Sequence, residues 1–369
     1  MKIGIICEYN PFHNGHIYHL QQIKSLYPNC LIILILSGNI TQRGDISIIN
    51  KWDKTSIALD NGVDLVIELP FSFASQSADI FANGALKILN ELKVDIICFG
   101  SELNNPDILI KAARTQLTNN YSNTLKKYVD KYSYPKACSL ALKELCKINI
   151  NKPNDLLGLS YTREIIKNNY NIKIQTIKRT NDYHSLNLDN ISSATSIRNA
   201  ICKNIPINKY VPIESLNKIN KNLNLDNYFD LLKYKIISTD NLTYIHMVDD
   251  NIEKRIKKGI YKSENIDELI KNIKTKKYSY NRIKRILIYI LFDFRKSDYN
   301  SNTYIRILGF NKKGQNYLSN IKKNIKMPII TNYSNSNGLI DIDIKIDNIL
   351  NLKLNNPMNR EIKKIIIRK

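Results

Sequence analysis

The sequence predicts an α/β fold, in which residues 1–200 form a parallel, doubly wound sheet and residues 201–369 form a basic, mainly helical region. Within residues 1–200, short apolar runs typical of buried parallel strands alternate with longer segments whose apolar residues recur every three or four positions. Strands and helices that alternate in this order form parallel sheets with right-handed crossovers. Beyond residue 201 the pattern is mainly helical and lysine becomes frequent, which indicates a second region.

Each element of the first region has its own signal. Apolar segments predict five strands, at Lys2–Cys7, Cys30–Leu36, Val63–Leu69, Val94–Phe99 and Ile172–Lys178. Helices are expected at His16–Leu26, Lys51–Asp60, Ser75–Leu92 and Asp155–Asn168, with two more between Pro106 and Cys146. Asn61-Gly62 is typical of a helix end and Pro70 closes the third strand, so both mark boundaries between elements.

A change in composition predicts a domain boundary near residue 201. Residues 201–222 are rich in Asn, Lys and Pro and show no regular period. A chain of 369 residues is long enough for two or three domains. After the boundary, helices are expected at Leu225–Ser238, Asp249–Lys258, Asn265–Ile273, Tyr280–Phe292 and Gln315–Lys323, with a short element at Tyr304–Leu308. We therefore divide the chain into domains at 1–200 and 201–369.

The positive charge is concentrated in the second region. The formal net charge is +22 at pH 7. Residues 1–200 contain 22 Lys and Arg against 17 Asp and Glu, a net charge of +5, whereas residues 201–369 contain 33 against 16, a net charge of +17. A composition rich in Asn, Lys, Ile and Tyr raises lysine throughout the chain and does not explain this difference. The second region is therefore expected to bind a polyanion such as a nucleic acid.

Composition also argues against several classes of protein. The longest apolar stretch, Leu31–Leu36, is far shorter than the roughly 20 residues that span a bilayer, and no segment resembles a signal peptide. The six cysteines show no CxxC spacing, so we expect reduced core residues rather than disulfides or zinc ligands. These observations predict a cytoplasmic protein with no membrane partner and no metal site of its own. The sequence carries no signal for the oligomeric state.

The clearest functional signal is an HxGH motif, formed by His13, Gly15 and His16 directly after the first predicted strand. A helix N-terminus binds phosphates readily, and Gly15 lets the backbone approach them closely. Imidazoles one turn apart can donate to phosphates as negative charge develops at the α-phosphorus of ATP. Two histidines near a surface turn are often structural instead, but their position in an α/β pattern favours the phosphate site. His19 on the same helix is interpreted as a packing or solvent residue.

A second segment, ISSATSIR at residues 191–198, has the composition of another phosphate-binding turn. Its hydroxyl residues Ser192, Ser193, Thr195 and Ser196 crowd one turn before Arg198. An arginine there can bind two phosphate oxygens at once. The alternative interpretation is that the hydroxyl residues only cap the following helix.

Together these segments resemble the HIGH-type nucleotidyltransferase superfamily, which has a Rossmann-like fold and in which an HxGH motif and an ISxTxIR element close over ATP. Longer stretches resemble the tRNA(Met) cytidine acetate ligase family, from Met1 to about Leu318: GIICEYNPFHNGH, SGNITQRGD, VIELPF, PNDLLGLSY, YHSLNLDNISSATSIR, YSYNRIKRILIYIL and YIRILGFNKKG. The resemblance implies an enzyme that activates acetate with ATP as acetyl-adenylate. It further implies transfer of the acetyl group to N4 of the wobble cytidine of elongator tRNA(Met).

The resemblance also implies which residues bind ATP. The main segment comprises Cys7, Glu8, Tyr9, Asn10, Pro11, Phe12, His13, Asn14, Gly15, His16, Ile17, Tyr18, His19 and Leu20. Contacts near the adenosine are implied at Gly100, Asn154 and Arg179. The positions of Gly100 and Arg179 agree with a general rule, because ligands of open α/β sheets bind beyond the carboxyl ends of strands. His13, His16 and Arg198 are the candidate catalytic residues, and Mg²⁺ is expected to arrive with ATP.

Other polar residues of the first region are weaker candidates. The possible pocket residues are Asn39, Gln42, Arg43, Ser193 and Thr195. The first three lie in a loop after the second strand, and binding residues often lie in such loops, although the loop could equally be an ordinary connection. Glu68 is expected to be a buried structural acid paired with a loop N–H, with a catalytic role as the alternative. Trp52 is expected to be a packing residue, with stacking on a base as the alternative.

In the second region, basic residues alternate with tyrosines. The candidate tRNA-binding residues are Lys276, Lys277, Arg282, Lys284 and Arg285. Basic and aromatic side chains together suit contact with phosphates and with an unstacked base, and Tyr278 and Tyr280 supply the rings. The alternative is an amphipathic helix, with isoleucines and leucines in the core and the charges in solvent. Both interpretations can hold for one helix.

Two other functions fit part of the sequence. A small-molecule adenylyltransferase would need the HxGH and SxTxIR motifs but would not need the +17 charge of the second region. A non-catalytic RNA-binding factor would need that charge but would not need to keep His13, His16, Asn154, Arg179 and Arg198.

Overall fold

The computed structural model describes residues 1–179, 192–276, 278–299 and 302–369. Its strands are β1 (Lys2–Cys7), β2 (Leu31–Ser37), β3 (Leu65–Leu69), β4 (Ile96–Ser101), β5 (Lys173–Lys178), β6 (Ile305–Phe310), β7 (Ile329–Ile330) and β8 (Ile367–Arg368). They form one sheet in the order β5-β4-β1-β2-β3-β6-β7, with β8 paired to β6. The five strands predicted from the sequence are confirmed, each within two residues of its expected bounds.

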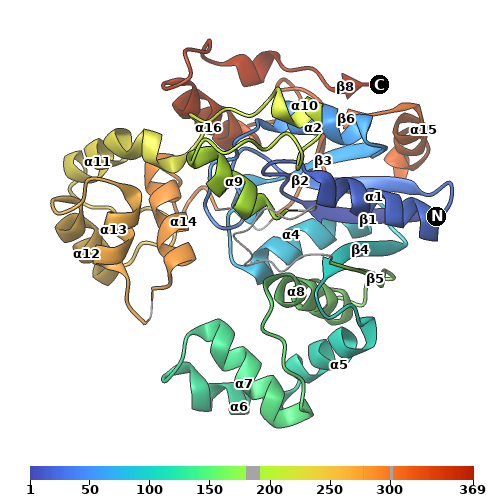
Figure 1. The fold of residues 1–369 in the computed structure, drawn as a ribbon, viewed down its shortest axis with the longest axis horizontal. Helices are drawn as coiled ribbons and strands as arrows, with labels where there is room; N and C mark the ends of the chain where they lie inside the picture. Colours follow the sequence, from blue (N-terminus) through green and yellow to red (C-terminus); the bar gives the residue numbers. More distant parts are fainter. Residues whose placement is uncertain (180–191, 277, 300–301) are drawn as a thin grey trace.

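Helices cover both faces of this sheet (Figure 1). Those of the first part are α1 (Asn14–Leu26), α2 (Lys51–Asp60), α3 (Phe71–Ala74), α4 (Ala78–Glu91), α5 (Pro106–Gln116), α6 (Asn119–Val129), α7 (Tyr134–Cys146), α8 (Pro153–Lys167) and α9 (Ala194–Cys202). Those of the later part are α10 (Ile213–Leu216), α11 (Phe229–Ser238), α12 (Asp250–Ile260), α13 (Ile266–Ile273), α14 (Tyr280–Leu291), α15 (Lys312–Ile321) and α16 (Asp341–Asn351). Short 3-10 turns lie at Leu225–Tyr228, Lys322–Asn324 and Arg360–Lys363.

The first five strands run parallel, and the order of the strands locates the ligand-binding edge. The chain builds outward from β1 to β2 and β3 on one side, and then returns to place β4 and β5 on the other side of β1. In open α/β sheets, ligands bind beyond the carboxyl ends of the strands where the order reverses in this way. We therefore expect a ligand to bind beyond the carboxyl ends of β1 and β4.

The composition of β2 explains why it lies at the centre of the sheet. Every residue of this strand is buried. Ile33 and Ile35 belong to the core that includes α4 and α8, whereas Ile32 and Leu34 belong to the core that includes α1 and α2. Since both faces are covered, a continuous apolar run replaces the alternation of a half-exposed strand.

The structure corrects three expectations. The helix expected at Ser75–Leu92 is shorter at its start, because α4 begins only at Ala78. Three helices rather than two lie within residues 106–146. The sheet also extends beyond residue 200, because β6 pairs antiparallel with β3, with Leu65 opposite Phe310. Every residue of β6 is buried, so this apolar segment covers an edge that β3 would otherwise expose.

The later helices form a bundle beside the sheet (α11–α14, Figure 1). The bundle packs around a core to which α12 contributes Ile252 and Ile256 and α13 contributes Leu269 and Ile270, and which also includes Phe71 of α3. The expected apolar stripe of α14 is confirmed, since Ile283 and its apolar neighbours along the helix are buried. No helix of the described residues is long and apolar enough to cross a membrane. All six cysteines are free.

Candidate active site

The HxGH motif forms a cap on α1 that is built from its own two histidines. His13 is the N-cap residue, and its Nδ1 accepts a hydrogen bond from the main-chain N–H of Gly15 at 3.0 Å. His16 lies one turn later, and its Nδ1 accepts from the main-chain N–H of His13 at 3.1 Å. This is a reciprocal capping box in which imidazoles replace the usual hydroxyl and carboxylate. The two rings stack with their centroids 3.8 Å apart.

This cap determines which nitrogen of each ring can act on a ligand. A neutral imidazole has one protonated and one unprotonated nitrogen, and both Nδ1 atoms are already acceptors. The proton of each neutral ring therefore resides on Nε2, which is left as a hydrogen-bond donor. Burial, together with the nearby Arg179 and Arg198, lowers the pKa of His13 to about 3. Burial and neighbouring histidines also lower the pKa of His16 well below its usual value. Both rings are thus neutral donors near pH 7.

Arg198 connects the second motif to the first. Its Nη1 donates to the carbonyl oxygen of Asn10 at 2.6 Å, and its Nη2 donates to Oγ1 of Thr195 at 3.4 Å. Ser193 is the N-cap residue of α9, since its Oγ accepts from the main-chain N–H of Ser196 at 3.1 Å. The capping interpretation is therefore confirmed for Ser193. The first turn of α9 nevertheless faces the same pocket as the histidines, so capping and ligand binding are compatible there.

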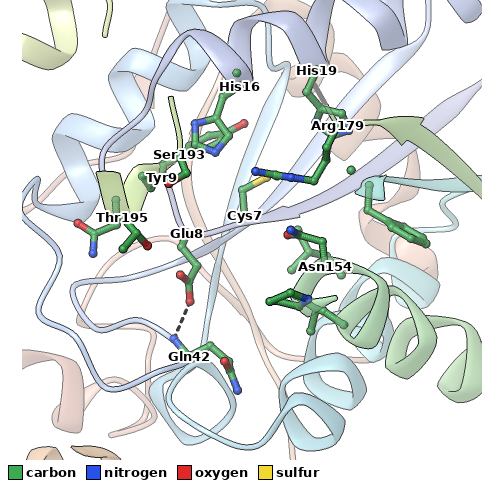
Figure 2. A pocket seen from close by; sticks show the side chains of 18 of the residues that line it. Cys7, Glu8, Tyr9, His16, His19, Gln42, Asn154, Arg179, Ser193 and Thr195 are labelled. Carbon is green, nitrogen blue, oxygen red and sulfur yellow. Dashed lines mark hydrogen bonds between the residues drawn. The ribbon is translucent and has the colours of Figure 1, made fainter. Parts of the chain in front are cut away.

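A pocket of about 480 Å³ brings most of the predicted site residues together (Figure 2). Its lining includes Cys7, Glu8, Tyr9, Asn10, His13, Gly15, His16, Tyr18, His19, Gly100, Asn154, Arg179, Gln42, Arg43, Ser193, Thr195 and Arg198. The lining surrounds the carboxyl end of β1 and the end of β4, as the strand order indicates. Its described cationic side chains are Arg43, Lys178, Arg179 and Arg198, and its described carboxylates are Glu8 and Asp45. The excess of positive charge favours an anionic ligand.

Arg179 lies across the end of β4 and beside the histidines. The main-chain N–H of Arg179 donates to the carbonyl oxygen of Ser101 at 3.1 Å. A Cβ at Gly100 would lie 3.3 Å from Cγ of Arg179, so the absence of a side chain at Gly100 gives the arginine its room. The Nε of Arg179 is buried without a hydrogen-bond partner in the described structure. Figure 2 shows the guanidinium close to His19 and Cys7, where it can bind a ligand oxygen.

Some residues of the predicted ATP segment lie behind the pocket rather than in its lining. These are Pro11, Phe12, Asn14, Ile17 and Leu20. Phe12 and Leu20 pack in the core on the α1 face of the sheet. Asn39, from the loop after β2, also lies outside this pocket, and its Oδ1 accepts from the main-chain N–H of Lys51 at 3.0 Å.

Comparison with protein families identifies the family to which this pocket belongs. A model described as HIGH Nucleotidyl Transferase matches residues 1–364. The chain belongs to the HIGH nucleotidyl transferase family.

Relatives within the HIGH family have more specific names. The tRNA(Met) cytidine acetate ligase of Mycoplasma mobile is 42% identical over 304 residues, which covers 80% of this chain and all of the relative. That of Bacillus subtilis is 36% identical over 392 residues, with 97% and 94% covered. The crystal structure of apo Thermotoga maritima TmcAL matches with a TM-score of 0.90 at 30% identity, covering 100% of this chain and 99% of that one. The same protein bound with alpha-thio ATP matches with a TM-score of 0.89 at 30% identity, with both chains fully covered.

Two aromatic residues that line the pocket were not predicted from the sequence. Phe99 and Tyr161 both line it, and their rings meet edge to face with centroids 5.6 Å apart. Phe99 directly precedes Gly100, and Tyr161 lies on α8, the helix that also carries Asn154. The Nδ2 of Asn154 donates to Oε1 of Glu102 at 2.6 Å, which fixes its orientation. The position of Phe99 directly before Gly100 was the one available signal, but an apolar residue at a strand end is indistinguishable from a core residue in sequence.

Sequence reasoning also missed Lys54, which supports the pocket from behind. Lys54 is fully buried, and its Nζ donates to the carbonyl oxygens of Glu8, Ser37 and Gly38 at 2.9, 2.8 and 2.7 Å. These carbonyls lie at the ends of β1 and β2, so one ammonium group joins two strand ends. Burial lowers the pKa of Lys54 to about 7. Its position among apolar residues of an amphipathic helix gave no signal of this role.

Glu68 and Trp52 belong to a buried ionic cluster. The Oε1 of Glu68 lies 3.0 Å from Nζ of Lys51, and its Oε2 lies 2.9 Å from Nη1 of Arg306. Glu361 accepts from Nε1 of Trp52 at 2.9 Å and also pairs with both cations of the cluster. The expectation of a buried structural acid is confirmed for Glu68, but its partners are two cations rather than a loop N–H. Trp52 is buried and packs as expected.

The basic cluster of the second region divides into exposed and buried parts. Lys276 is exposed, and Arg282 lies over the ring of Tyr278 at 5.0 Å. Lys284 pairs with Asp45 of the pocket loop, and Nη1 of the buried Arg285 donates to the carbonyl oxygen of Gln42 at 3.4 Å. The last two candidates thus join the bundle to the pocket loop. Lys277 lies outside the described residues.

The same loop contacts α14 through Gly44, whose φ is +81°. A Cβ at this position would lie 2.9 Å from the main-chain nitrogen of Arg285. Glycine is therefore required both by the backbone conformation and by the close approach of the helix. Within the described residues, no group of three or more His, Cys, Asp or Glu side chains gathers as a metal site.

Proposed function

We propose that this chain is an ATP-dependent tRNA(Met) cytidine acetate ligase. It forms acetyl-adenylate from ATP and acetate, and then transfers the acetyl group to N4 of the wobble cytidine of elongator tRNA(Met). The names of relatives that match nearly their whole length support this function. The proposed location is the cytoplasm, where ATP and tRNA meet.

One observation carries the ATP chemistry. Two neutral imidazoles with Nε2–H donors, Arg179, Arg198 and the N-terminus of α9 converge on one pocket. Such groups are fixed before the substrate arrives, so they stabilise developing charge without rearranging. The triphosphate is proposed to lie across the N-termini of α1 and α9, with the adenosine towards Gly100, Asn154 and Phe99.

In the first step, an oxygen of acetate attacks the α-phosphorus and pyrophosphate leaves. The Nε2–H groups of His13 and His16 donate to phosphate oxygens as their negative charge rises. Arg198 and Arg179 contribute permanent charge to the same oxygens. Mg²⁺ is proposed to enter bound to the triphosphate, and it would neutralise part of its charge.

The tRNA is proposed to lie on the helical bundle of residues 225–291. The net charge of +17 beyond residue 200 supports this position, because phosphate contacts dominate the affinity of nucleic-acid complexes. Lys284 and Arg285 already contact the pocket loop that carries Gln42. An anticodon held on the bundle would therefore lie next to the pocket in which acetyl-adenylate forms.

The function is tested by following both steps in one reaction. Purified protein is incubated with α-labelled ATP and acetate without tRNA, and the expected product is acetyl-adenylate with pyrophosphate. After addition of tRNA, nucleoside analysis by mass spectrometry should detect N4-acetylcytidine in elongator tRNA(Met) alone.

Parallel reactions with propionate and with phosphopantetheine test the other candidates. Adenylate transfer to phosphopantetheine without modification of tRNA would identify a small-molecule adenylyltransferase. Absence of pyrophosphate under every condition, with tRNA binding intact, would identify a non-catalytic RNA-binding factor.

A further inference from the structure

The pocket contains a carboxylate to which the proposed adenylation step assigns no role. Glu8 follows β1 directly, and its Oε1 accepts the main-chain N–H of Gln42 at 2.7 Å. Its carbonyl oxygen is held by Nζ of Lys54 at 2.9 Å, so both its backbone and its side chain are fixed. Figure 2 shows the carboxylate on the side of the pocket near Gln42, away from His16 and Arg179.

The other described carboxylate of the pocket is already neutralised. Asp45 forms an ion pair with Lys284, and the pKa of Asp45 is lowered because Lys284 and two arginines outweigh the effect of its burial. Glu8 forms no ion pair with any described residue, and the structure gives its Oε2 no hydrogen-bond partner there. Glu8 is thus the one described carboxylate of the lining that has an oxygen without a hydrogen-bond partner and that forms no ion pair.

Electrostatics determine what kind of group this oxygen can bind. An ionised carboxylate only accepts hydrogen bonds and protons, and it repels phosphate and acetate. Glu8 therefore does not suit the phosphates of ATP or the carboxylate of acetate. It suits a group that donates a hydrogen bond and must then lose a proton. In the proposed reaction that group is the N4 amine of cytidine.

We propose that Glu8 is the general base of acetyl transfer, an inference that rests on the proposed function. N4 of cytidine attacks the carbonyl carbon of acetyl-adenylate and forms the new C–N bond. The anhydride C–O bond breaks, and AMP leaves with that electron pair. The proton lost from N4 moves to Oε2 of Glu8 and then to solvent, while Oε1 keeps its hydrogen bond to Gln42.

The two steps of the reaction allow this role to be isolated. The variant Glu8→Gln keeps a side-chain oxygen for the N–H of Gln42, so the loop stays in place, but it cannot accept a proton. Acetate-dependent exchange of pyrophosphate into ATP, measured without tRNA, reports separately what the change does to the ATP site, because Glu8 lies in the segment expected to bind ATP. Single-turnover acetyl transfer, from enzyme preloaded with acetyl-adenylate to saturating tRNA, should fall about a hundredfold or more, the usual scale of general-base catalysis.

The pH dependence of transfer distinguishes a base from a binding group. Parent enzyme should lose transfer activity on the acid side of its pH–rate profile, and this acid limb should be absent from the profile of Glu8→Gln. Glu8→Asp, which keeps a displaced carboxylate, should retain the limb with an intermediate rate. Equal loss of exchange and transfer in Glu8→Gln would overturn the proposal and assign Glu8 to the ATP site. Unchanged transfer in Glu8→Gln would overturn it as well.

Failure of the proposed function gives a different result. If the parent enzyme itself forms no acetyl-adenylate or transfers no acetyl group, both proposals fall. If the parent transfers acetyl and Glu8→Gln does so at the same rate, only the role of Glu8 falls.

Discussion

Arg198 and Asn10 join the two segments that we propose to bind phosphate, since Nη1 of the arginine lies 2.6 Å from the carbonyl oxygen of the asparagine. The Oδ1 of Asn10 in turn accepts from the main-chain N–H of Ile48 at 2.9 Å. Three segments that are distant in sequence are thereby fixed around one pocket. This contact holds the guanidinium beside the position that we propose for the phosphates.

The contact predicts that a positive charge at position 198 is not enough to support adenylation at the parental rate. Arg198→Lys keeps a positive charge but cannot donate from two nitrogens in a fixed plane. We expect it to lower acetate-dependent pyrophosphate exchange by about tenfold to a hundredfold, and Arg198→Gln to lower it further. Exchange by Arg198→Lys equal to that of the parent would show that the two-nitrogen geometry has no role.

His16→Ala should lower adenylate formation by about a hundredfold or more, the scale of losing one preorganised donor. It also removes the acceptor for the N–H of His13, so a thermal melt must accompany the rate measurement. The matched control is His246→Gln, because His246 stacks on Tyr299 outside the pocket. The control should keep the parental rate. Near-normal exchange in His16→Ala would refute the role of the HxGH pair.

Acidification should destabilise the fold through its buried histidines. Burial lowers the pKa of His13 to about 3 and of His19 to about 4, whereas unfolded histidines titrate near 6.5. Between these values the unfolded state binds more protons, so the free energy of unfolding falls as the pH falls from about 6.5 towards 3. Above about pH 6.5 these groups contribute no pH dependence.

Each such histidine adds a slope of about 1.4 kcal/mol per pH unit in that range. Urea unfolding at pH 7.5, 6 and 5 should therefore show a steep loss of stability. The variant His19→Gln should reduce the slope, while its stability at pH 7.5 serves as the reference. An identical slope in parent and variant would exclude His19 from the effect.

Arg306→Met should cost about 3 to 5 kcal/mol of stability, because it leaves Glu68 and Glu361 buried with only Lys51 to neutralise them. The measurement is urea unfolding of the full chain. The control is Lys127→Met, which removes a solvent-exposed pair with Glu144 and should have little effect. Similar losses from both variants would show that burial of the cluster is unimportant.

Exposed lysines of the bundle should determine the salt dependence of tRNA binding. Lys271, Lys274 and Lys276 are exposed in and after α13. Replacing all three with Gln should weaken tRNA binding and lower the slope of log affinity against log salt by about one for each phosphate that the variant no longer neutralises. Arg285→Met, which removes a buried side chain, should lower thermal stability instead. An unchanged slope in the triple variant would place the tRNA elsewhere.

The sequence by itself determined the five parallel strands of the sheet and most of the residues that line the pocket. Apolar runs such as Leu31–Leu36 predict buried strands because a strand covered on both faces has no polar positions. The HxGH motif and Arg198 were recognisable because phosphate chemistry demands particular residue types at short, fixed spacings. Gly100 and Arg179 were implied by the family resemblance, and their positions just beyond the fourth and fifth strands agree with the rule that ligands bind at the carboxyl ends of parallel strands.

Only the tertiary structure decided what depends on contacts between distant segments. Arg285 belongs to a basic run in sequence, yet it is buried against the loop of Gln42. Lys54 looks like any lysine of an amphipathic helix, yet it joins the ends of two strands. β6 joins the sheet from more than 200 residues away. The periodicity of apolar residues indicates which face of a helix or strand is buried, but not which other segment covers it. That segment depends on how the whole chain packs.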